Sequence, residues 1–178
     1  MNSFQYFQLK EDASLSMPIR IFHFAVEGDY TAGKPIDPGS VPKHQVAYFE
    51  YSPQVEICDV LFRPVLLVKS EIKKLWQFYE PHMKYKGVQV FANDTRINVA
   101  PMYWCPMIDS ISCMDVGTQR YPDRSIKRLV LQFQAVQGRH IFQVAGLLER
   151  ITVVSLPVAE SMLKRSATGF QLQAVDLV

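Results

Sequence analysis

One pattern occurs twice in this chain of 178 residues: a strand-like apolar run, a serine, an amphipathic stretch, a glycine and a second strand-like run. The first copy consists of Val65–Val68, Ser70, Ile72–Tyr79, Gly87 and Val88–Phe91. The second consists of Ile151–Val154, Ser155, Val158–Arg165, Gly169 and Phe170–Val175. The pattern predicts a strand, a helix and a second strand in each copy, with both helices placed on a common sheet.

The amphipathic stretch of the first copy predicts a surface helix with one buried face. Positions i, i+3, i+4 and i+7 of the stretch hold Ile72, Leu75, Trp76 and Tyr79. Ser70 is expected to cap the helix through its hydroxyl, and Glu71 suits the positive end of the helix dipole. Pro81 marks the end of the helix, because proline cannot continue it.

The second copy predicts a similar helix with a narrower apolar stripe, formed by Ala159, Met162 and Leu163. Ser155 is expected to be its cap, and Pro157 sits in the first turn, where a missing N–H does no harm. In both copies the glycine is expected to end the helix and lead into the next strand.

The rest of the chain is rich in strand patterns separated by turn signals. Strands are expected at Ile19–Phe24, Val46–Tyr51, Met102–Ile108, Ile126–Phe133 and His140–Val144, a hairpin joins Val88–Ala92 to Thr95–Val99, and Tyr121–Ser125 forms a turn. Gly28–Pro42 carries three glycines and three prolines, which predicts a loop. These patterns predict an α+β fold, with two main helices on a mostly antiparallel or mixed sheet.

The length fits one domain, or at most two small ones. We expect a single domain over residues 1–178, in which residues 1–45 supply a strand and the Gly/Pro-rich loop. The formal charge is +2 and the cations are scattered, which argues against a dedicated nucleic-acid binder. A secretory signal and a membrane-spanning run are both missing from the sequence, so we expect a cytoplasmic protein without a membrane partner.

The three cysteines, Cys58, Cys105 and Cys113, form no CxxC pair and are expected to be reduced structural thiols. The four histidines are isolated from one another and from cysteine, so the sequence predicts no metal site. Gly28–Lys34 matches GxxxxGK, but Pro35 follows where a phosphate-binding loop needs Ser or Thr and the start of a helix. The sequence therefore predicts no nucleotide or other cofactor.

Two constellations could carry catalysis. Ser155 follows a strand and precedes a helix as a hydrolase nucleophile does, but the residues around it include no glycine to relax the turn, so capping is the favoured interpretation. Asp109 and Asp115 could supply paired carboxylates if His140 lay nearby. Asp109 stands beside Ser110 in a turn-prone segment, which favours a structural role.

The order of several segments resembles a large, divergent family of bacterial immunity proteins from polymorphic toxin systems, long carried as a domain of unknown function. The similarity lies in Leu61–Ser70 with its helix, the Tyr103-Trp104 strand leading to Ile111–Asp115, His140–Phe142, and Val153–Ser155 with its helix and Gly169-Phe170. It covers about residues 46–176 by pattern. The resemblance implies a non-enzymatic protein that binds a cognate toxin and blocks it, with contact residues that vary with the toxin.

Three functions are consistent with the sequence. The first is a cytoplasmic immunity protein that occludes a toxin. The second is a small enzyme or ligand-binding module using Asp109, Asp115 and His140, and the third is a nucleotide or small-ligand module built on the Gly28–Lys34 loop.

Overall fold

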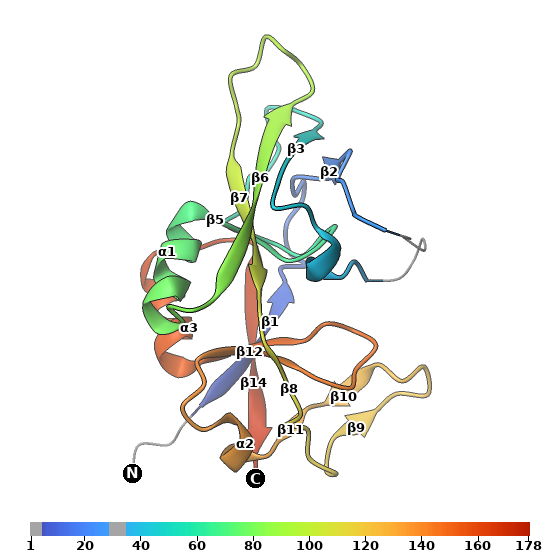
Figure 1. Ribbon diagram of the computed structural model, residues 1–178, viewed down its shortest axis with the longest axis vertical. Helices are drawn as coiled ribbons and strands as arrows, with labels where there is room; N and C mark the ends of the chain where they lie inside the picture. The colour runs from blue at the N-terminus through green and yellow to red at the C-terminus, as the bar shows by residue number, and fades with distance from the viewer. Residues whose placement is uncertain (1–4, 29–34) are drawn as a thin grey trace. The chain divides into compact units, whose positions relative to one another are not determined.

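The computed structural model describes residues 5–28 and 35–178 (Figure 1). The chain divides into two compact units. Unit 1 consists of Met1–Lys10, Ile108–Arg165 and Gln171–Val178, and unit 2 consists of Glu11–Met107 and Ser166–Phe170. Each unit is built around a six-stranded sheet in which parallel and antiparallel neighbours are mixed. The predicted α+β class is confirmed.

The sheet of unit 2 has the strand order β2-β3-β6-β7-β5-β4. These strands are β2 (Ile21–Phe22), β3 (His44–Phe49), β4 (Val60–Leu61), β5 (Leu67–Lys69), β6 (Lys84–Ala92) and β7 (Met102–Met107). β3 and β6 run parallel, and the other neighbours run antiparallel. The long central pair β6–β7 therefore carries the short strands at both edges of the sheet.

One face of this sheet forms the core of unit 2. Side chains alternate between the two faces of a strand, and on β3 the buried residues are Ala47 and Phe49. Val88, Val90 and Tyr103 continue the same buried face on β6 and β7. The Tyr103 hydroxyl donates a hydrogen bond to the Cys58 carbonyl oxygen at 2.7 Å, which satisfies the polar end of this buried ring.

Helix α1 (Ser70–Tyr79) belongs to unit 2 and packs on β5 and β7. Its buried residues are Ile72, Leu75 and Trp76, as the periodicity predicts, whereas Tyr79, the fourth residue of the predicted stripe, is only half-buried. A short 3-10 helix, η1 (Pro38–Ser40), interrupts the predicted Gly28–Pro42 loop. The Asp37 side chain accepts a hydrogen bond from the Gly39 N–H at 3.2 Å and so starts this turn.

The sheet of unit 1 has the strand order β11-β14-β1-β13-β12-β8. Its strands are β1 (Tyr6–Glu11), β8 (Ser110–Ile111), β11 (Val130–Leu131), β12 (Ile141–Val144), β13 (Thr152–Ser155) and β14 (Phe170–Leu177). A separate antiparallel ribbon is formed by β9 (Gln119–Arg120) and β10 (Ile126–Arg128), and the predicted turn at Tyr121–Ser125 connects them. The core includes Tyr6 and Phe142, whose rings meet edge to face at 5.7 Å.

Two helices complete unit 1, α2 (Phe133–Val136) and α3 (Leu156–Lys164). Pro157 lies in the first turn of α3, as predicted. The buried stripe of α3 is formed by Val158, Ala159 and Met162. The prediction that Leu163 belongs to this stripe is wrong, because its side chain is exposed.

The predicted repeat does not hold in detail. The strand-helix-strand order is present as β5-α1-β6 and as β13-α3-β14, but the two copies lie in separate sheets rather than on a common one. Within the described residues neither serine hydroxyl caps its helix: the cap of α1 is Lys69, and Ser155 occupies the cap position of α3 without a capping bond. Gly87 lies inside β6 and does not end α1.

One predicted strand pairing and the length of one predicted strand also differ from the structure. Val88–Ala92 does not form a tight hairpin with Thr95–Val99, because a loop of residues 93–101 follows β6 and its antiparallel partner is Met102–Met107. The strand expected over Ile19–Phe24 is limited to Ile21–Phe22. His23 ends the strand, since its φ of 54° is incompatible with an extended strand.

Among the described residues, no helix has the length and apolar character needed to cross a bilayer.

Candidate functional site

The face of the unit 2 sheet opposite the core exposes three aromatic side chains in one row across three strands. Phe22 on β2 pairs with Tyr48 on β3, and Tyr48 pairs with Phe91 on β6. All three are exposed, with relative accessibilities of 37, 40 and 39%. We call Phe22, Tyr48 and Phe91 the aromatic row.

The row is an ordered feature. The rings of Phe22 and Tyr48 stack with centroids 6.3 Å apart, and the ring of His23 meets both of them edge-on at 5.2 and 6.2 Å. His23 adopts a left-handed φ of 54°, a conformation that costs a non-glycine residue about 1–2 kcal/mol. The local fold tolerates this cost at His23, directly after Phe22.

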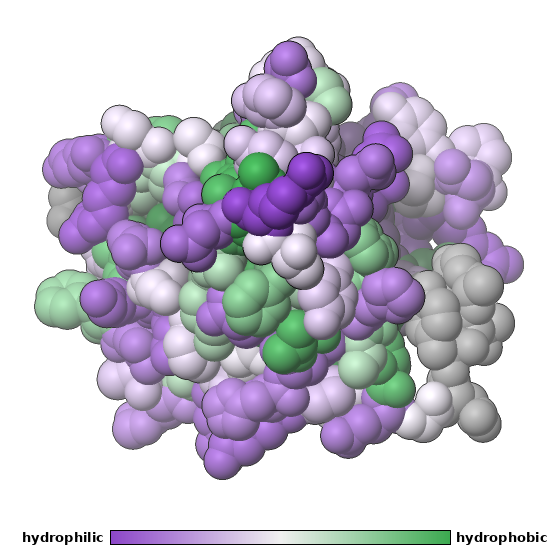
Figure 2. All heavy atoms as spheres, turned by 90° about the horizontal axis from the view of Figure 1, so that it is seen from above, coloured by the Kyte–Doolittle hydropathy of each residue, from purple (hydrophilic) through white to green (hydrophobic). Residues whose placement is uncertain are grey.

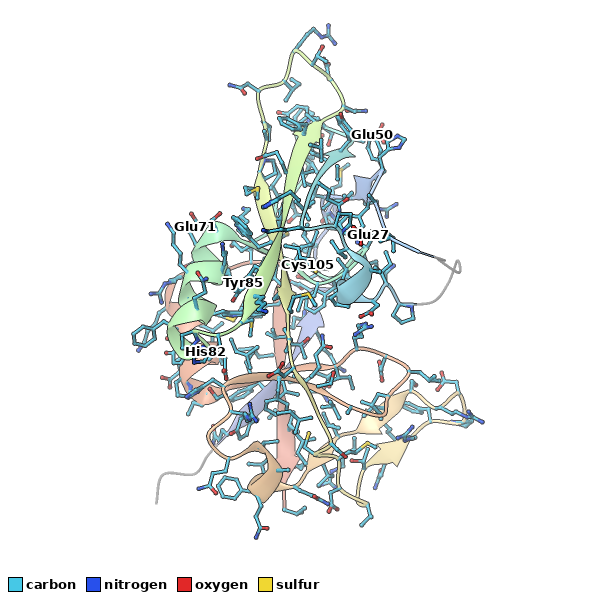
Figure 3. All side chains as sticks on the ribbon, in the orientation of Figure 1. Glu27, Glu50, Glu71, His82, Tyr85 and Cys105 are labelled. Atoms are coloured by element: carbon cyan, nitrogen blue, oxygen red, sulfur yellow. The ribbon has the colours of Figure 1, made fainter. Side chains whose placement is uncertain are left out.

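Val46 adds an apolar side chain beside the row, toward the start of β3. It is two residues from Tyr48, so its exposed side chain stands on the same face of the sheet. His44 and Glu50 are further exposed residues of the same parity, and Figure 3 labels Glu50 near the end of β3. Along β3 the apolar strip of Val46 and Tyr48 is thus flanked by polar groups, and it crosses the row at Tyr48.

Helix α1 packs mainly on β5 and β7 and leaves the three side chains of the row exposed. Its Lys73 ammonium is 3.3 Å from the centre of the Trp104 ring on β7 and 5.4 Å from that of Tyr85 at the start of β6. The Trp104 ring N–H donates to the Ser70 hydroxyl at 3.1 Å, which fixes the first turn of the helix on β7. Figure 3 shows Tyr85 beside α1.

The area around Lys73 is more enclosed than the row. Burial lowers the pKa of the Lys73 ammonium and raises the pKa of the Tyr85 hydroxyl, because both charged forms lose hydration. Within the described residues, the Tyr85 hydroxyl and the ring N–H of Trp76 are buried without a hydrogen-bond partner. This area holds the helix on the sheet, whereas the row is accessible.

The chemistry of the row is that of a contact surface. Aromatic side chains supply large apolar area with few torsions to immobilise, and they are enriched where proteins bind other proteins. Seen from the side of the loop between β6 and β7, the surface shows small groups of apolar residues among hydrophilic ones (Figure 2). A strip of this kind suits a partner that presents an apolar segment.

The three residues predicted as possible catalytic groups are held by separate contacts. Asp115 accepts a hydrogen bond from the Gly117 N–H at 2.8 Å, so it is a turn residue. Asp109 is exposed, and its carbonyl oxygen accepts from the Gln143 N–H at 2.9 Å. In the part of the chain that the structure describes, no hydrogen bond or ion pair joins either aspartate to His140.

His140 instead contacts the serine that the repeat singled out. Its Nδ1 atom is 2.9 Å from the Ser155 Oγ atom, and only 6% of Ser155 is exposed. A serine and a histidine at this distance form the nucleophile and base of many hydrolases, but there the hydroxyl must reach a substrate. The contact is explained by the fold, since the Ser155 N–H also donates to the His140 carbonyl oxygen at 2.9 Å.

The other candidate groups do not assemble into a site. Over residues 5–28 and 35–178, no three His, Cys, Asp or Glu side chains form a group that could hold a metal ion. Cys58, Cys105 and Cys113 are buried, and these three described cysteines form no disulfide. The Gly28–Lys34 motif lies outside the described residues apart from Gly28, which has a positive φ of 83°.

The comparisons with known proteins add no family. No protein-family model matches the chain, and no curated protein is significantly similar to it.

The residues of the row could not be predicted as a group from the sequence because they lie far apart in the chain. The available signal was the alternation along β3, in which Val46 and Tyr48 interleave with Ala47 and Phe49, but the pairing of β2, β3 and β6 cannot be read from it.

Proposed function

We propose that this protein is a cytoplasmic immunity protein that binds a cognate bacterial toxin and blocks it without catalysis. The proposal combines the resemblance of residues 46–176 with one structural observation. That observation is the exposed aromatic row of Phe22, Tyr48 and Phe91, aligned in register on the part of the sheet that α1 leaves open.

The row has the features of an interface centre. A few buried aromatic anchors supply most of the binding energy of a typical interface, and the surrounding contacts mainly exclude water. The three rings stand on paired strands, so little conformational freedom remains to be lost on binding. A partner covering the row and its neighbours on β2, β3 and β6 would form an interface of about 800 Å² per partner.

The immunity role is tested with the protein encoded beside this chain's gene, which the proposal expects to carry a toxin domain. We expect co-expression of the chain to restore growth of cells that make the toxin domain, and the two purified proteins to form a tight complex. Tyr48→Ser combined with Phe91→Ser should weaken that complex by at least about a hundredfold, since each lost anchor costs ~1.4 kcal/mol or more.

Phe78→Ser is the matched control. Phe78 lies on α1, outside the row, and is 81% exposed, so its loss should change neither growth rescue nor affinity. A toxin that stays lethal and unbound contradicts the immunity role. A toxin that is bound equally well by the double variant leaves the immunity role standing and shows that the row is not its contact surface.

The alternative of a small enzyme using Asp109, Asp115 and His140 has less support. Asp115 is engaged in its own turn, and the His140 ring is engaged by a buried serine. An enzyme would need these groups around one accessible cavity.

A further inference from the structure

Unit 2 contains a cleft of about 510 Å³ that is separate from the aromatic row. Small-molecule sites typically have volumes of about 300–1,000 Å³ and are mostly apolar with a few polar groups. The cleft is lined by β4, the turn that follows it, and the segment that leads into β2. Three of its lining residues are buried and apolar, Ile19, Val60 and Leu61. The inner wall of the cleft would therefore hold an apolar group away from water.

The exposed lining residues are charged. They are Arg20, Arg63 and Glu11. Arg63 Nε is 3.4 Å from Glu11 Oε2, and the two side chains are 85% and 43% exposed, so the pair is a weak surface ion pair. Within the described residues, Arg20 has no ion pair or side-chain hydrogen bond. The rim thus has one cation in excess, and a guanidinium group matches the geometry of an anionic oxygen pair.

We infer that this cleft binds a small amphipathic anion, in which an apolar body lies against Ile19, Val60 and Leu61 and a carboxylate, sulfonate or phosphate group meets Arg20 and Arg63. The apolar wall removes the body of the ligand from water, and the two arginines favour ligands that carry an anionic group. Glu11 competes with the anion for Arg63. This ligand site is independent of the proposed toxin-binding surface.

The test uses a pair of fluorescent probes that differ in charge. Anilinonaphthalene sulfonate has an aromatic body with one anionic group, and phenylnaphthylamine has the same body without it. We expect the full chain to bind the sulfonate at one saturable site. Its affinity for the neutral probe should be lower by a factor of about ten or more. Decanoate should displace the bound sulfonate at lower concentration than decanol does.

Variants of the rim assign the binding to the cleft. Arg20→Ala with Arg63→Ala should weaken sulfonate binding about tenfold or more, whereas Glu11→Gln should strengthen it because Arg63 is released. Arg96→Ala removes an exposed arginine elsewhere in unit 2 and should have no effect. Tyr48→Ser should also have no effect, which separates the cleft from the row.

Circular dichroism and the urea midpoint of each variant establish that it is folded. Equal binding of the charged and neutral probes overturns the inference, because the cleft would then lack anion recognition. Unchanged sulfonate affinity in both the double arginine variant and Glu11→Gln also overturns it, since the probe would then be bound elsewhere. A gain in Glu11→Gln together with a loss in the arginine variant supports it.

Discussion

The Nδ1 atom of His140 and the Oγ atom of Ser155 are 2.9 Å apart, in a contact that links the end of β13 to the residue before β12. The contact takes the serine hydroxyl away from the capping role that its place before α3 suggests. We expect Ser155→Ala to lower the free energy of unfolding by about 0.5–1.5 kcal/mol, because the part-buried contact with the His140 ring is lost. Urea unfolding measures this, with Ser112→Ala, an exposed serine of the same unit, as the control.

Despite this contact, the burial of Ser155 predicts low chemical reactivity of its hydroxyl. Ser155 is nearly fully buried, so a fluorophosphonate probe should not label it in the folded chain at a rate above that of other serines. Mass spectrometry of the labelled protein locates any adduct. Rapid labelling of Ser155 that disappears in a His140→Ala variant would favour a hydrolase and contradict a purely structural role.

Local patterns in the sequence predict much of the secondary structure, because they report burial directly. The stripe of α1, Pro157 in the first turn of α3 and the turn at Tyr121–Ser125 are all found as predicted. The serine roles could not be predicted, since they depend on partners distant in sequence. Ser70 accepts from Trp104, which is 34 residues away.

The role of Gly87 shows why a glycine in a sequence is ambiguous. A Cβ at this position would lie 2.9 Å from His44 Nδ1 and 3.0 Å from Met102 Cε, so a larger residue would have to displace the ends of two side chains packed over β6. The same pairing of distant strands creates the aromatic row. Glycine is used both where a helix ends and where side chains pack closely over a strand. Which of the two roles a glycine has depends on neighbours that come from other parts of the chain.

Among the described glycines of unit 2, Gly169 is expected to be the most sensitive to substitution. It has a φ of 96°, and a Cβ there would collide with the Val60 carbonyl oxygen and lie 2.7 Å from Cys58 Cβ. We expect Gly169→Ala to lower the free energy of unfolding by about 2–5 kcal/mol, from backbone strain together with the collision. Gly146→Ala is the control, because Gly146 has a φ of 79° and open space around it.

The comparison of these two variants in urea separates strain from collision. Gly146→Ala should cost only about 1–2 kcal/mol, the backbone cost alone. Equal losses in the two variants would mean that the segment around Gly169 moves away from β4 without cost, contrary to the structure.

The contact of Lys73 with Trp104 should stabilise the attachment of α1. The Lys73 ammonium lies 3.3 Å from the centre of the Trp104 ring, and burial lowers its pKa, so the contact is partly removed from water. We expect Lys73→Gln to lower the free energy of unfolding by about 0.5–2 kcal/mol. Lys74→Gln changes the exposed neighbouring lysine and should have almost no effect.

A double-mutant cycle checks that the loss comes from the ring. The effect of Lys73→Gln should be smaller in a Trp104→Leu background, where the ammonium has no indole ring to contact. An undiminished effect in that background would assign the stabilisation to another neighbour of Lys73.

Stability should fall at alkaline pH because of buried thiols. Burial raises the pKa of the Cys113 thiol from 9.0 to about 11, and it also raises the pKa of the Cys58 thiol. Between pH 9.0 and about 11 the unfolded chain has lost the Cys113 proton while the folded chain retains it. The free energy of unfolding therefore decreases as pH rises through this window and is unaffected by the thiol below it.

Urea midpoints at a series of pH values from 8 to 11 measure this decrease, and Cys113→Ala should have a shallower slope than the wild type at every pH above about 9. The variant is expected to be less stable at all pH values because it leaves a small cavity, so the slope and not the absolute stability is the readout. Cys58→Ala gives the corresponding change for unit 2. A slope that Cys113→Ala leaves unaltered would mean that the Cys113 thiol has the same pKa in the folded and the unfolded protein, contrary to the effect of its burial.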